Sequence, residues 1–322
     1  MGKKNRLRLE RQKKLQKQVD DHMKTLNIAP VPGLAENTRE LVTKMMSHPG
    51  YNNPNYKWSL DDFELGKRLG RGAFGRVFLA RERRSGYLVA VKTLLKKDVV
   101  EEGSERDILH EIEIHSHLKH PNIIQMLCWF HDSHRIYIVS DYAGQGAVSQ
   151  HLKDAGRFDD QRSAKYIYQV AAALEYCHDN HVIHRDIKPE NLLLDVVGDV
   201  KVADFGASKH SPSLTANSFR GTVDYIPPEM VEVKEYTYLV DNWCLGILCY
   251  EFLHGYPPFE ADTSAETFSR IRMRDLHFDE HINKKAKDFI SKLIVLNQKK
   301  RMSLKDAMKH PWIMENYVNL NN

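Results

Sequence analysis

Residues 184–191 read HRDIKPEN, and the tripeptide DFG follows from Asp204; no other part of the chain indicates its chemistry so clearly. The order of side chains suits the transfer of a phosphoryl group held by a metal ion, which is catalysed mainly by positioning and charge neutralisation. Asp186 would orient a substrate hydroxyl and accept its proton, while Lys188 would place a cation near the transferred group. Asn191 and Asp204 carry the hard oxygen ligands that Mg2+ prefers. Either motif alone could be a solvated turn, but their spacing favours one catalytic unit.

Composition places the chain among globular proteins with ample core. It has 322 residues, of which 42% are apolar and 28% charged. No apolar run approaches the roughly 20 residues that span a bilayer, and the N-terminus is too charged for a secretory signal, so we expect an intracellular protein without a membrane span. The cysteines lack metal-ligand spacing, which predicts free thiols packed in the core. They are Cys128, Cys177, Cys244 and Cys249.

The basic charge belongs to an N-terminal arm. Residues 1–27 hold nine basic and three acidic side chains, a net charge of +6 in a chain whose total is +4. Interleaved leucines would let the arm form a helix on an acidic partner, nucleic acid or a membrane surface; the alternative is a solvated tail. A Pro- and Asn-rich linker follows. We therefore expect residues 1–57 to be an arm and linker, largely disordered, with the folded part beginning near Trp58.

A glycine-rich turn opens the folded part. Residues 70–75 read GRGAFG and lie between two stretches that alternate apolar and polar residues like strands. Glycines allow the turn to lie close to phosphates, with backbone N–H groups facing the anion. In a dinucleotide-binding fold a similar pattern precedes a helix, whereas a strand is expected here.

Lys92 ends the strand-like stretch VAVK, and a lysine there is costly to bury without a partner. The expected helix 105–118 offers Glu111, which would hold Lys92 against the phosphates of a nucleotide. The alternative is that Glu111 is one of several solvated acids on that helix. The residues expected to face the core, and so to orient the helix, are Ile108, Leu109, Ile112 and Leu118.

From about residue 63 to residue 313 the chain resembles a eukaryotic protein kinase, and within that superfamily it is most similar to the Aurora kinases. The closer likeness lies in HSHLKHPNI at 115–123, GTVDYIPPEM at 221–230, LCYEFL at 248–253 and HPWI at 310–313. The resemblance implies an α+β, two-lobed fold. Its parts would be a mainly β N-lobe with one regulatory helix (58–142), a mainly helical C-lobe (143–313) and a C-terminal tail (314–322).

The resemblance also implies ATP and Mg2+ as cofactors. Residues 136–139 would lead into the hinge between lobes, where backbone groups of Asp141 and Ala143 hydrogen-bond adenine. The implied catalytic residues are Lys92, Glu111, Asp186 and Lys188, and the implied metal ligands are Asn191 and Asp204. The implied ATP-binding residues are Leu69, Gly70, Gly72, Gly75, Val77, Ala90, Lys92, Asp141, Ala143 and Leu193.

Three C-lobe contacts are implied by the same match. Glu229 would pair with Arg301, and Asp241 would anchor the backbone of the catalytic loop. Thr222 would hydrogen-bond Asp186 and Lys188, an arrangement of serine/threonine kinases, and Lys188 itself argues against a tyrosine kinase.

Glu190 and Glu251 match acidic positions that hold an arginine of the substrate in basophilic kinases. Arginine's planar fork suits carboxylates. We therefore expect phosphorylation of Ser or Thr with Arg about two residues before the target. The alternative for Glu251 is an ordinary helix charge.

Ser218 falls where Aurora kinases carry an activating phosphothreonine, and Thr215 and Thr222 are alternatives. A phosphate there would order the loop by pairing with Arg185 and Lys209. Two basic residues of the family are replaced, by His110 and Ala216. Ser218 would thus depend on another kinase, or the loop would be held without phosphate.

Three further departures concern specificity. Ser140 replaces a large apolar gatekeeper, which predicts access for inhibitors that carry a bulky group behind adenine. Ala207 replaces a tryptophan after DFG. Cys128 is neither the Gly of A-type nor the Asn of B-type Auroras, so the subtype stays open.

The expected function is that of an Aurora-like serine/threonine kinase acting on protein substrates in cell division. An activating protein partner and an acidic partner for the arm are compatible with the resemblance. The expected location is the cytoplasm and cytoskeleton, at spindle or centrosome, and/or the nucleus and chromosomes. The alternative is a catalytically weak kinase-fold scaffold, which only the replaced basic residues support.

Overall fold

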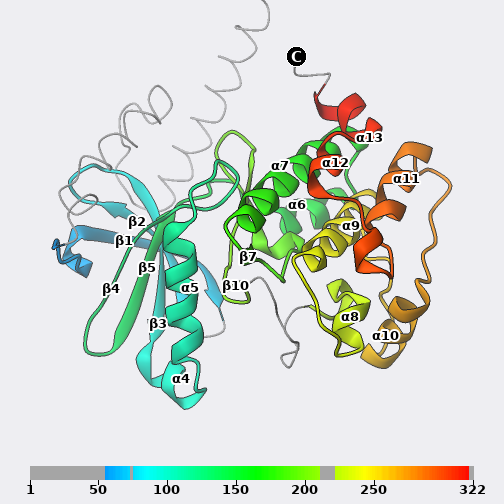
Figure 1. Ribbon diagram of the computed structural model, residues 1–322. Coiled ribbons are helices and arrows are strands. Elements are labelled where there is room, and N and C mark those ends of the chain that lie inside the picture. The colour runs from blue at the N-terminus through cyan, green and yellow to red at the C-terminus, as the bar shows by residue number, and fades with distance from the viewer. Residues whose placement is uncertain (1–54, 73–74, 211–221, 319–322) are drawn as a thin grey trace, which may run out of the picture. The chain divides into compact units, whose positions relative to one another are not determined.

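The computed structural model describes residues 55–72, 75–210 and 222–318 (Figure 1), which form two compact units. The first unit takes the described residues of 1–117, with 124–144 and 195–198. The second takes 118–123, 145–194 and the described residues from 199 onward. The first is mainly β and the second mainly helical, which confirms the predicted α+β class.

One antiparallel sheet dominates the first unit. The order of its strands is β1-β2-β3-β5-β4. Their bounds are Phe63–Gly72 (β1), Gly75–Glu82 (β2), Leu88–Leu95 (β3), Met126–His131 (β4) and Arg135–Asp141 (β5). A short 3-10 helix, Leu60–Asp62, precedes β1, and two helices, α4 (Lys96–Glu101) and α5 (Glu105–His117), follow β3. Since successive side chains of a strand point to opposite faces, every strand contributes to two different layers.

The inner face of the sheet packs against α4 and α5. Leu94 of β3 and Ile138 of β5 form a buried cluster with Val99 of α4 and with Ile108 and Ile112 of α5. In Figure 1, α5 runs along the sheet beside β3 and β5. This packing fixes the position of α5 by its apolar stripe, as the sequence predicted.

Leu109 does not belong to that stripe. The prediction that it faces the core was wrong, because its side chain is 58% exposed. Residues advance by about 100° around a helix, so Leu109 lies beyond Ile108 on the side away from Glu111 and His115, which are both buried. Helix α5 also ends at His117, so the buried Leu118 follows the helix instead of completing it.

The second unit consists mainly of helices, with short strands beside them. The helices are α6 (Val148–Ala155), α7 (Asp160–Asp179), α8 (Pro228–Val231), α9 (Leu239–His254), α10 (Ser264–Met273), α11 (Lys284–Leu293), α12 (Leu304–Met308) and α13 (Pro311–Ile313). Four shorter helical turns are η2 (Pro189–Asn191), η3 (Val223–Tyr225), η4 (Gln298–Lys300) and η5 (Met314–Val318). The strands are β6 (Gly146–Ala147), β7 (Val182–Ile183), β8 (Leu192–Leu194), β9 (Val200–Val202) and β10 (Lys209–His210).

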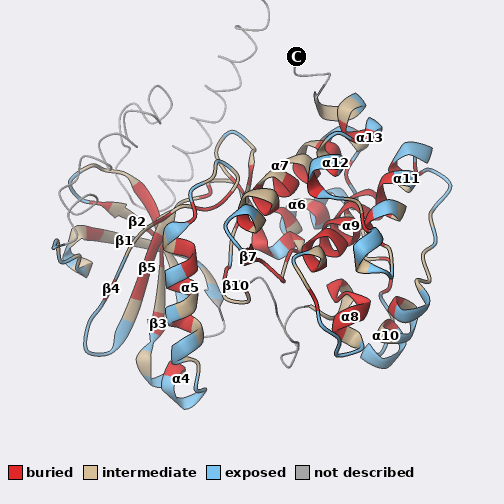
Figure 2. Ribbon diagram, in the orientation of Figure 1, coloured by how far each residue is buried: buried red, intermediate tan, exposed pale blue. Residues whose placement is uncertain are grey.

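Helix α9 is the centre of the second unit. It is buried along almost its whole length, as Figure 2 shows, and a helix that is apolar on all sides belongs in a core. A Cβ at Gly246 would come within 2.8 Å of Ile294, so glycine lets α9 approach the chain after α11. The helix ends at Gly255, whose φ of 92° is typical of a left-handed cap.

Two predictions from composition can be checked here. All four cysteines are free, and Cys177, Cys244 and Cys249 are buried, while Cys128 packs beside the aromatic cluster of the sheet. Burial raises the pKa of each thiol, which agrees with a packing role. Among the helices of the described ranges, none combines the length and apolar character needed to cross a membrane.

Candidate active site

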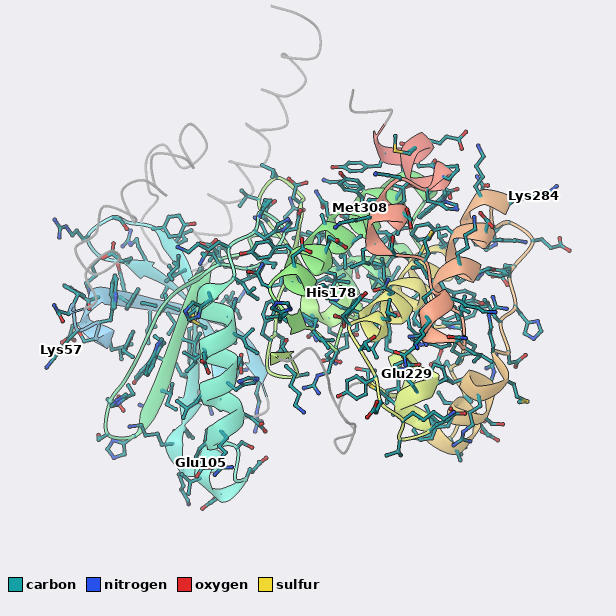
Figure 3. All side chains as sticks on the ribbon, in the orientation of Figure 1. Lys57, Glu105, His178, Glu229, Lys284 and Met308 are labelled. Atoms are coloured by element: carbon teal, nitrogen blue, oxygen red, sulfur yellow. The ribbon has the colours of Figure 1, made fainter. Side chains whose placement is uncertain are left out.

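The backbone of the HRDIKPEN loop is held by one buried carboxylate. Asp241 of α9 is fully buried, and it accepts the N–H groups of His184 at 2.9 Å and Arg185 at 2.8 Å. Its third partner is Nε2 of His178 on α7, at 2.8 Å (Figure 3). Burial alone would raise the pKa of Asp241, but the hydrogen bond and charge of His178 and the loop N–H groups lower it below its ordinary value. The predicted anchoring contact is therefore present.

Sequence reasoning missed His178. It is the penultimate residue of α7, where a histidine reads as a favourable charge at a helix C-terminus. The available signal was the carboxylate itself, because an ionised Asp accepts about four hydrogen bonds and two backbone N–H groups do not satisfy it when buried. A third donor was therefore to be expected on a neighbouring helix.

Arg185 connects the loop to the segment after DFG. Its backbone has a φ of 68°, a left-handed conformation, and its guanidinium is buried. The guanidinium donates to the carbonyls of Ala207 at 2.6 Å and Ser208 at 3.4 Å, and to the hydroxyl of Tyr236 at 2.9 Å. Arg185 thus fixes the start of the segment that was matched to an activation loop.

The carboxylate of Asp186 is surrounded by donors. Nζ of Lys188 lies 2.9 Å from its Oδ2, and Nδ2 of Asn191 donates to the same oxygen at 2.8 Å. Thr222 accepts a hydrogen bond from Lys188 at 2.7 Å, and its hydroxyl lies 3.5 Å from Oδ1 of Asp186. The predicted contacts of Thr222 are therefore present. Together they hold the Asp186 carboxylate in one orientation.

His184 links the loop to the residues before DFG. It is fully buried, and burial lowers the pKa of its imidazole, which favours the neutral ring. Nδ1 accepts the N–H of Asp186 at 3.3 Å, and Nε2 donates to the carbonyl of Ala203 at 3.2 Å. Its ring packs edge-on against Phe205, with centroids 5.0 Å apart. A neutral histidine can make both bonds at once, so it sets the spacing between Asp186 and Asp204.

Asn191 and Asp204 fit a magnesium ion. The amide nitrogen of Asn191 is occupied by the backbone carbonyl and side chain of Asp186, both at 2.8 Å, which leaves its oxygen as a ligand. The Asp204 residue is exposed, with a φ of 61°, and within the described part of the chain its Oδ1 accepts a 3.3 Å bond from the N–H of Gly206. The described residues contain no cluster of three His, Cys, Asp or Glu side chains that could hold a metal. Two protein oxygens are what Mg2+ takes when phosphates and water supply its other ligands.

Lys92 and Glu111 form the predicted ion pair in the first unit. Nζ of Lys92 on β3 lies 2.8 Å from Oε1 of Glu111 on α5. The Glu111 side chain is only 6% exposed, whereas that of Lys92 is 29% exposed. The buried acid thus holds a lysine that still reaches solvent.

The strand ends beside Lys92 carry the residues matched to ATP binding. A Cβ at Gly75 would lie 1.7 Å from the carbonyl oxygen of Thr93, so only glycine fits there, whereas Gly70 has open space. Gly72 pairs with Gly75 across β1 and β2. Leu69 is 39% exposed, and the half-buried residues are Val77, Ala90 and, in the second unit, Leu193.

Two hinge positions and the gatekeeper lie at the end of β5. The N–H of Asp141 donates to the carbonyl of Gln125 at 3.0 Å. Ala143 follows and is buried. Ser140 lies opposite Ala90 on β3 and Met126 on β4 in the strand register, so its small side chain lies in the middle of the sheet.

Glu190 and Glu251, matched to arginine recognition, are neighbours. Glu251 of α9 accepts a short hydrogen bond from the hydroxyl of Tyr225, and Glu190 of η2 is exposed. Burial raises the pKa of Glu251 to about 7; the Tyr225 bond opposes that rise, and the charges of Glu190, Asp224 and Glu260 add to it. Sequence reasoning missed Asp224 and Glu260. No regular spacing relates either residue to Glu251. The available signal was that each acid lies in a short motif-like stretch, Asp224 in TVDY and Glu260 in PPFE.

Glu229 of α8, labelled in Figure 3, forms the predicted pair with Arg301. Both guanidinium NH groups donate to its carboxylate at 2.6 Å, and both residues are buried. Arg301 also donates to the carbonyls of Val295 and Leu239, each at 2.9 Å, and it lies over the ring of Trp243. All the polar groups of the pair are therefore engaged.

Several predictions lie outside the described residues. These are the N-terminal arm, Thr215, Ala216 and the phosphorylation site Ser218. Two residues connected with that site are described. Lys209, expected to pair with the phosphate, is half-buried in β10, and His110, which replaces a basic residue of the family, is half-buried on α5.

Comparison with known proteins gives a family. The protein kinase domain family matches residues 63–313. Aurora kinase B of Drosophila melanogaster is 50% identical over 280 residues, which cover 86% of this chain and 85% of that protein. Aurora kinase A-B of Xenopus laevis is 48% identical over 273 residues, 85% of this chain and 67% of that protein. Aurora kinase C of Mus musculus is 47% identical over 258 residues, 80% of this chain and 94% of that protein.

Proposed function

This chain belongs to the Aurora family of serine/threonine protein kinases, and we propose that Asp186 is the group that accepts the proton of the substrate hydroxyl. The observation that carries the proposal is the set of bonds from Lys188 and Asn191 to one oxygen of Asp186. They leave Oδ1, beside the hydroxyl of Thr222, as the oxygen that faces an incoming alcohol. A fixed base replaces the reorientation that a free carboxylate would need.

The remaining catalytic residues act on the nucleotide. Lys92, held by Glu111, would bind phosphate oxygens of ATP, and Lys188 would neutralise charge on the transferred group. Asn191 and Asp204 would hold Mg2+, which when bound neutralises phosphate oxygens and fixes their position. Members of the protein kinase family generally use ATP and Mg2+.

Two variants distinguish these roles. Asp186→Asn should abolish phosphorylation of a Ser/Thr peptide yet keep the rise in Tm that Mg-ATP causes, because its metal ligands are intact. Asp204→Asn should lose both. Turnover of the wild type no greater than that of Asp204→Asn would favour the scaffold alternative, and equal Mg-ATP stabilisation of all three proteins would contradict the assignment of Asp204.

We further propose that substrates carry Arg about two residues before the target Ser or Thr. The support is the cluster of carboxylates around Glu251, which offers an anionic site to a guanidinium. Glu190→Ala with Glu251→Ala should reduce kcat/KM for an Arg-containing peptide much more than for an Arg-free peptide. Glu280→Ala removes an exposed acid elsewhere and is the matched control. Equal losses on both peptides would refute the preference.

We propose that phosphorylation of Ser218 activates the kinase. The support is the contact of Arg185 with the carbonyls of Ala207 and Ser208, which places a cation at the start of the segment that carries Ser218. Activity should fall on phosphatase treatment, and Ser218→Ala should match the dephosphorylated enzyme. If Ser218→Ala equals the fully phosphorylated wild type, the loop is held without phosphate.

The family membership supports a role in mitosis, with protein substrates and an activating protein partner. We propose that the kinase acts at the spindle or centrosome in the cytoplasm, at chromosomes in the nucleus, or at both, and that its basic arm contacts an acidic partner. A fluorescent fusion followed through division tests the location, and neutralising the lysines and arginines of residues 1–27 tests the arm. Unchanged localisation of the neutralised protein would remove the arm from the proposal.

A further inference from the structure

Three serine or threonine residues of this chain have an arginine two positions before them, as the substrate preference proposed above requires: Ser85, Thr222 and Ser303. Ser303 follows Arg301, whose side chain has no exposure and is engaged in its buried ion pair. Thr222 accepts a hydrogen bond at 2.7 Å from Lys188 of the catalytic loop of the same chain. Both of these positions are therefore engaged in the structure of the chain itself.

Ser85 lies in the turn that joins β2 to β3. The turn comprises residues 83–87, with the sequence RRSGY, and both of its arginines are exposed. Arg83 stands two positions before Ser85. The register of β2 with β3 runs as far as Arg81 opposite Leu88, so the turn lies beyond the end of this ladder. A turn at such a place can open without loss of the strand pairing.

The hydroxyl of Ser85 holds this turn closed. It donates a short hydrogen bond to the carboxylate of Glu82, a residue that is 1% exposed. The same carboxylate accepts the N–H groups of Arg84 at 2.8 Å and of Ser85 at 2.6 Å, and the Ser85 hydroxyl oxygen accepts the N–H of Tyr87 at 3.1 Å. A phosphate on that oxygen would remove the donated hydrogen and place a charge of about −1.5 to −2 beside a buried carboxylate. The closed turn is therefore incompatible with phosphorylated Ser85.

We propose that Ser85 is a phosphorylation site that a second copy of this kinase modifies, and that the phosphate opens the β2–β3 turn beside the hinge. The acting copy would hold the guanidinium of Arg83 with its Glu190 and Glu251. The bond between the γ-phosphorus of ATP and the bridging oxygen breaks, a bond from that phosphorus to the Ser85 oxygen forms, and ADP leaves. The hydroxyl proton goes to Asp186 of the acting copy and from there to water.

The acting kinase is a second copy because Ser85 lies away from the phosphates of its own nucleotide. Lys92, which would bind those phosphates, is four residues from Leu88 along β3, or about 13 Å at about 3.3 Å per residue. Ser85 precedes Leu88 and lies beyond that end of the strand. Since β3 is paired with β2 along this length, the chain cannot carry Ser85 to Lys92 without breaking the sheet.

The turn is connected to the hinge by one side chain. The hydroxyl of Tyr87 donates to Oδ1 of Asp141 at 2.9 Å, and Asp141 also stands opposite Val89 in the register of β3 with β5. Backbone groups of Asp141 were matched to the binding of adenine. A turn that opens releases the N–H of Tyr87 from Ser85 and loosens this contact, so phosphorylation should weaken the binding of ATP.

The test uses an affinity-tagged full chain with Asp186→Asn as the substrate and the untagged wild type, in catalytic amount with Mg-ATP, as the enzyme. Mass spectrometry of the recovered substrate should find phosphate on Ser85 and none on Ser303. Arg83→Gln in the substrate chain should slow the modification of Ser85 about tenfold, because the guanidinium is lost. Arg84→Gln removes the same charge from the adjacent exposed position and is the matched control, which should react nearly as fast as the parent chain.

A peptide of residues 80–88 separates failure of this site from failure of the proposed preference. It carries Arg83 and Ser85 without the folded turn. If the wild type phosphorylates the peptide but not Ser85 of the intact chain, the preference stands and the proposal is overturned. If the peptide with Arg83→Gln reacts as fast as the parent peptide, the preference fails and the role of Arg83 fails with it. Equal slowing by Arg84→Gln and Arg83→Gln in the full chain would also overturn that role.

Hydrogen exchange tests the opening of the turn. The amides of Arg84, Ser85 and Tyr87 should exchange faster once Ser85 is phosphorylated, whereas the amide of Arg185, which Asp241 accepts, should not change. The rise in Tm that Mg-ATP causes should be smaller in the phosphorylated chain than in the unmodified chain. Unchanged exchange in the turn, or equal stabilisation of both forms by Mg-ATP, would overturn the proposed effect of the phosphate.

Discussion

The two units each contain one ion pair that the sequence predicted, and the pairs differ in how completely they are enclosed. Lys92 and Glu111 meet through one contact of 2.8 Å, and the lysine side chain is 29% exposed. Arg301 and Glu229 meet through two contacts of 2.6 Å, and the arginine side chain has no exposure at all. The lysine of the first pair reaches solvent, whereas the second pair lies inside the protein. An ion pair expected to meet a ligand thus differs from one that supports folding in how far its cation is exposed.

The largest effect is expected when the enclosed pair is broken. Arg301→Ala would leave the Glu229 carboxylate buried without its partner, which commonly costs about 3–5 kcal/mol. Urea unfolding should show this loss, with a fall in Tm of about 10 °C. Glu229→Leu with Arg301→Met removes both charges and should recover most of the stability. If the double variant is as unstable as Arg301→Ala, unpaired charge is the wrong explanation.

Breaking the open pair should affect turnover more than stability. Lys92→Met keeps the length of the side chain but removes the charge offered to ATP, and kcat/KM should fall by about 10²- to 10³-fold. The substitution also leaves the Glu111 carboxylate, 6% exposed, without this partner, so the Tm without nucleotide should fall, but by less than that of Arg301→Ala, because the Lys92 side chain reaches solvent. A loss of stability equal to that of Arg301→Ala would erase the distinction between the two pairs.

Glu251 offers a third, smaller test, since it is a mostly buried acid whose partner would arrive with the substrate. Its pKa is raised to about 7, so the charged form that binds arginine is present above that pH and is lost as the pH falls through it. The preference for an Arg-containing over an Arg-free peptide should decrease up to about tenfold between about pH 8 and about pH 6. Glu251→Gln should show a lower preference that does not vary with pH. A wild-type preference that is constant over this range would contradict the assignment.

The contacts that could be predicted from the sequence are those whose residues lie in recognised motifs. The partners of Lys92, Glu229 and Thr222 could be named because each belongs to a stretch matched to the kinase superfamily. The orientation of α5 was predicted only in part, since apolar character put Leu109 in the core while the helix turned it to solvent. The spacing of apolar residues predicts a buried stripe on a helix, but the edges of that stripe depend on the elements that pack against the helix.

The contacts that sequence reasoning missed join residues with no motif in common. His178 reaches Asp241 from another helix, and Asp224 and Glu260 affect Glu251 from two separate segments. A hollow of about 430 Å3 on the sheet is lined by residues of four strands, of the 3-10 helix before β1 and of α4, so no single stretch shows it. Such features depend on the register between strands and on the packing of helices, which local patterns do not determine.

Asp241 gives the catalytic loop a property that loops rarely have. Its carboxylate is fully buried in the central helix and receives the amide hydrogens of His184 and Arg185. Because both acceptor oxygens are buried in α9, we expect those two amides to exchange with deuterated water as slowly as the core of the unit. The residues beside the catalytic base would then lose their arrangement only when the whole helical unit unfolds, and not by local opening.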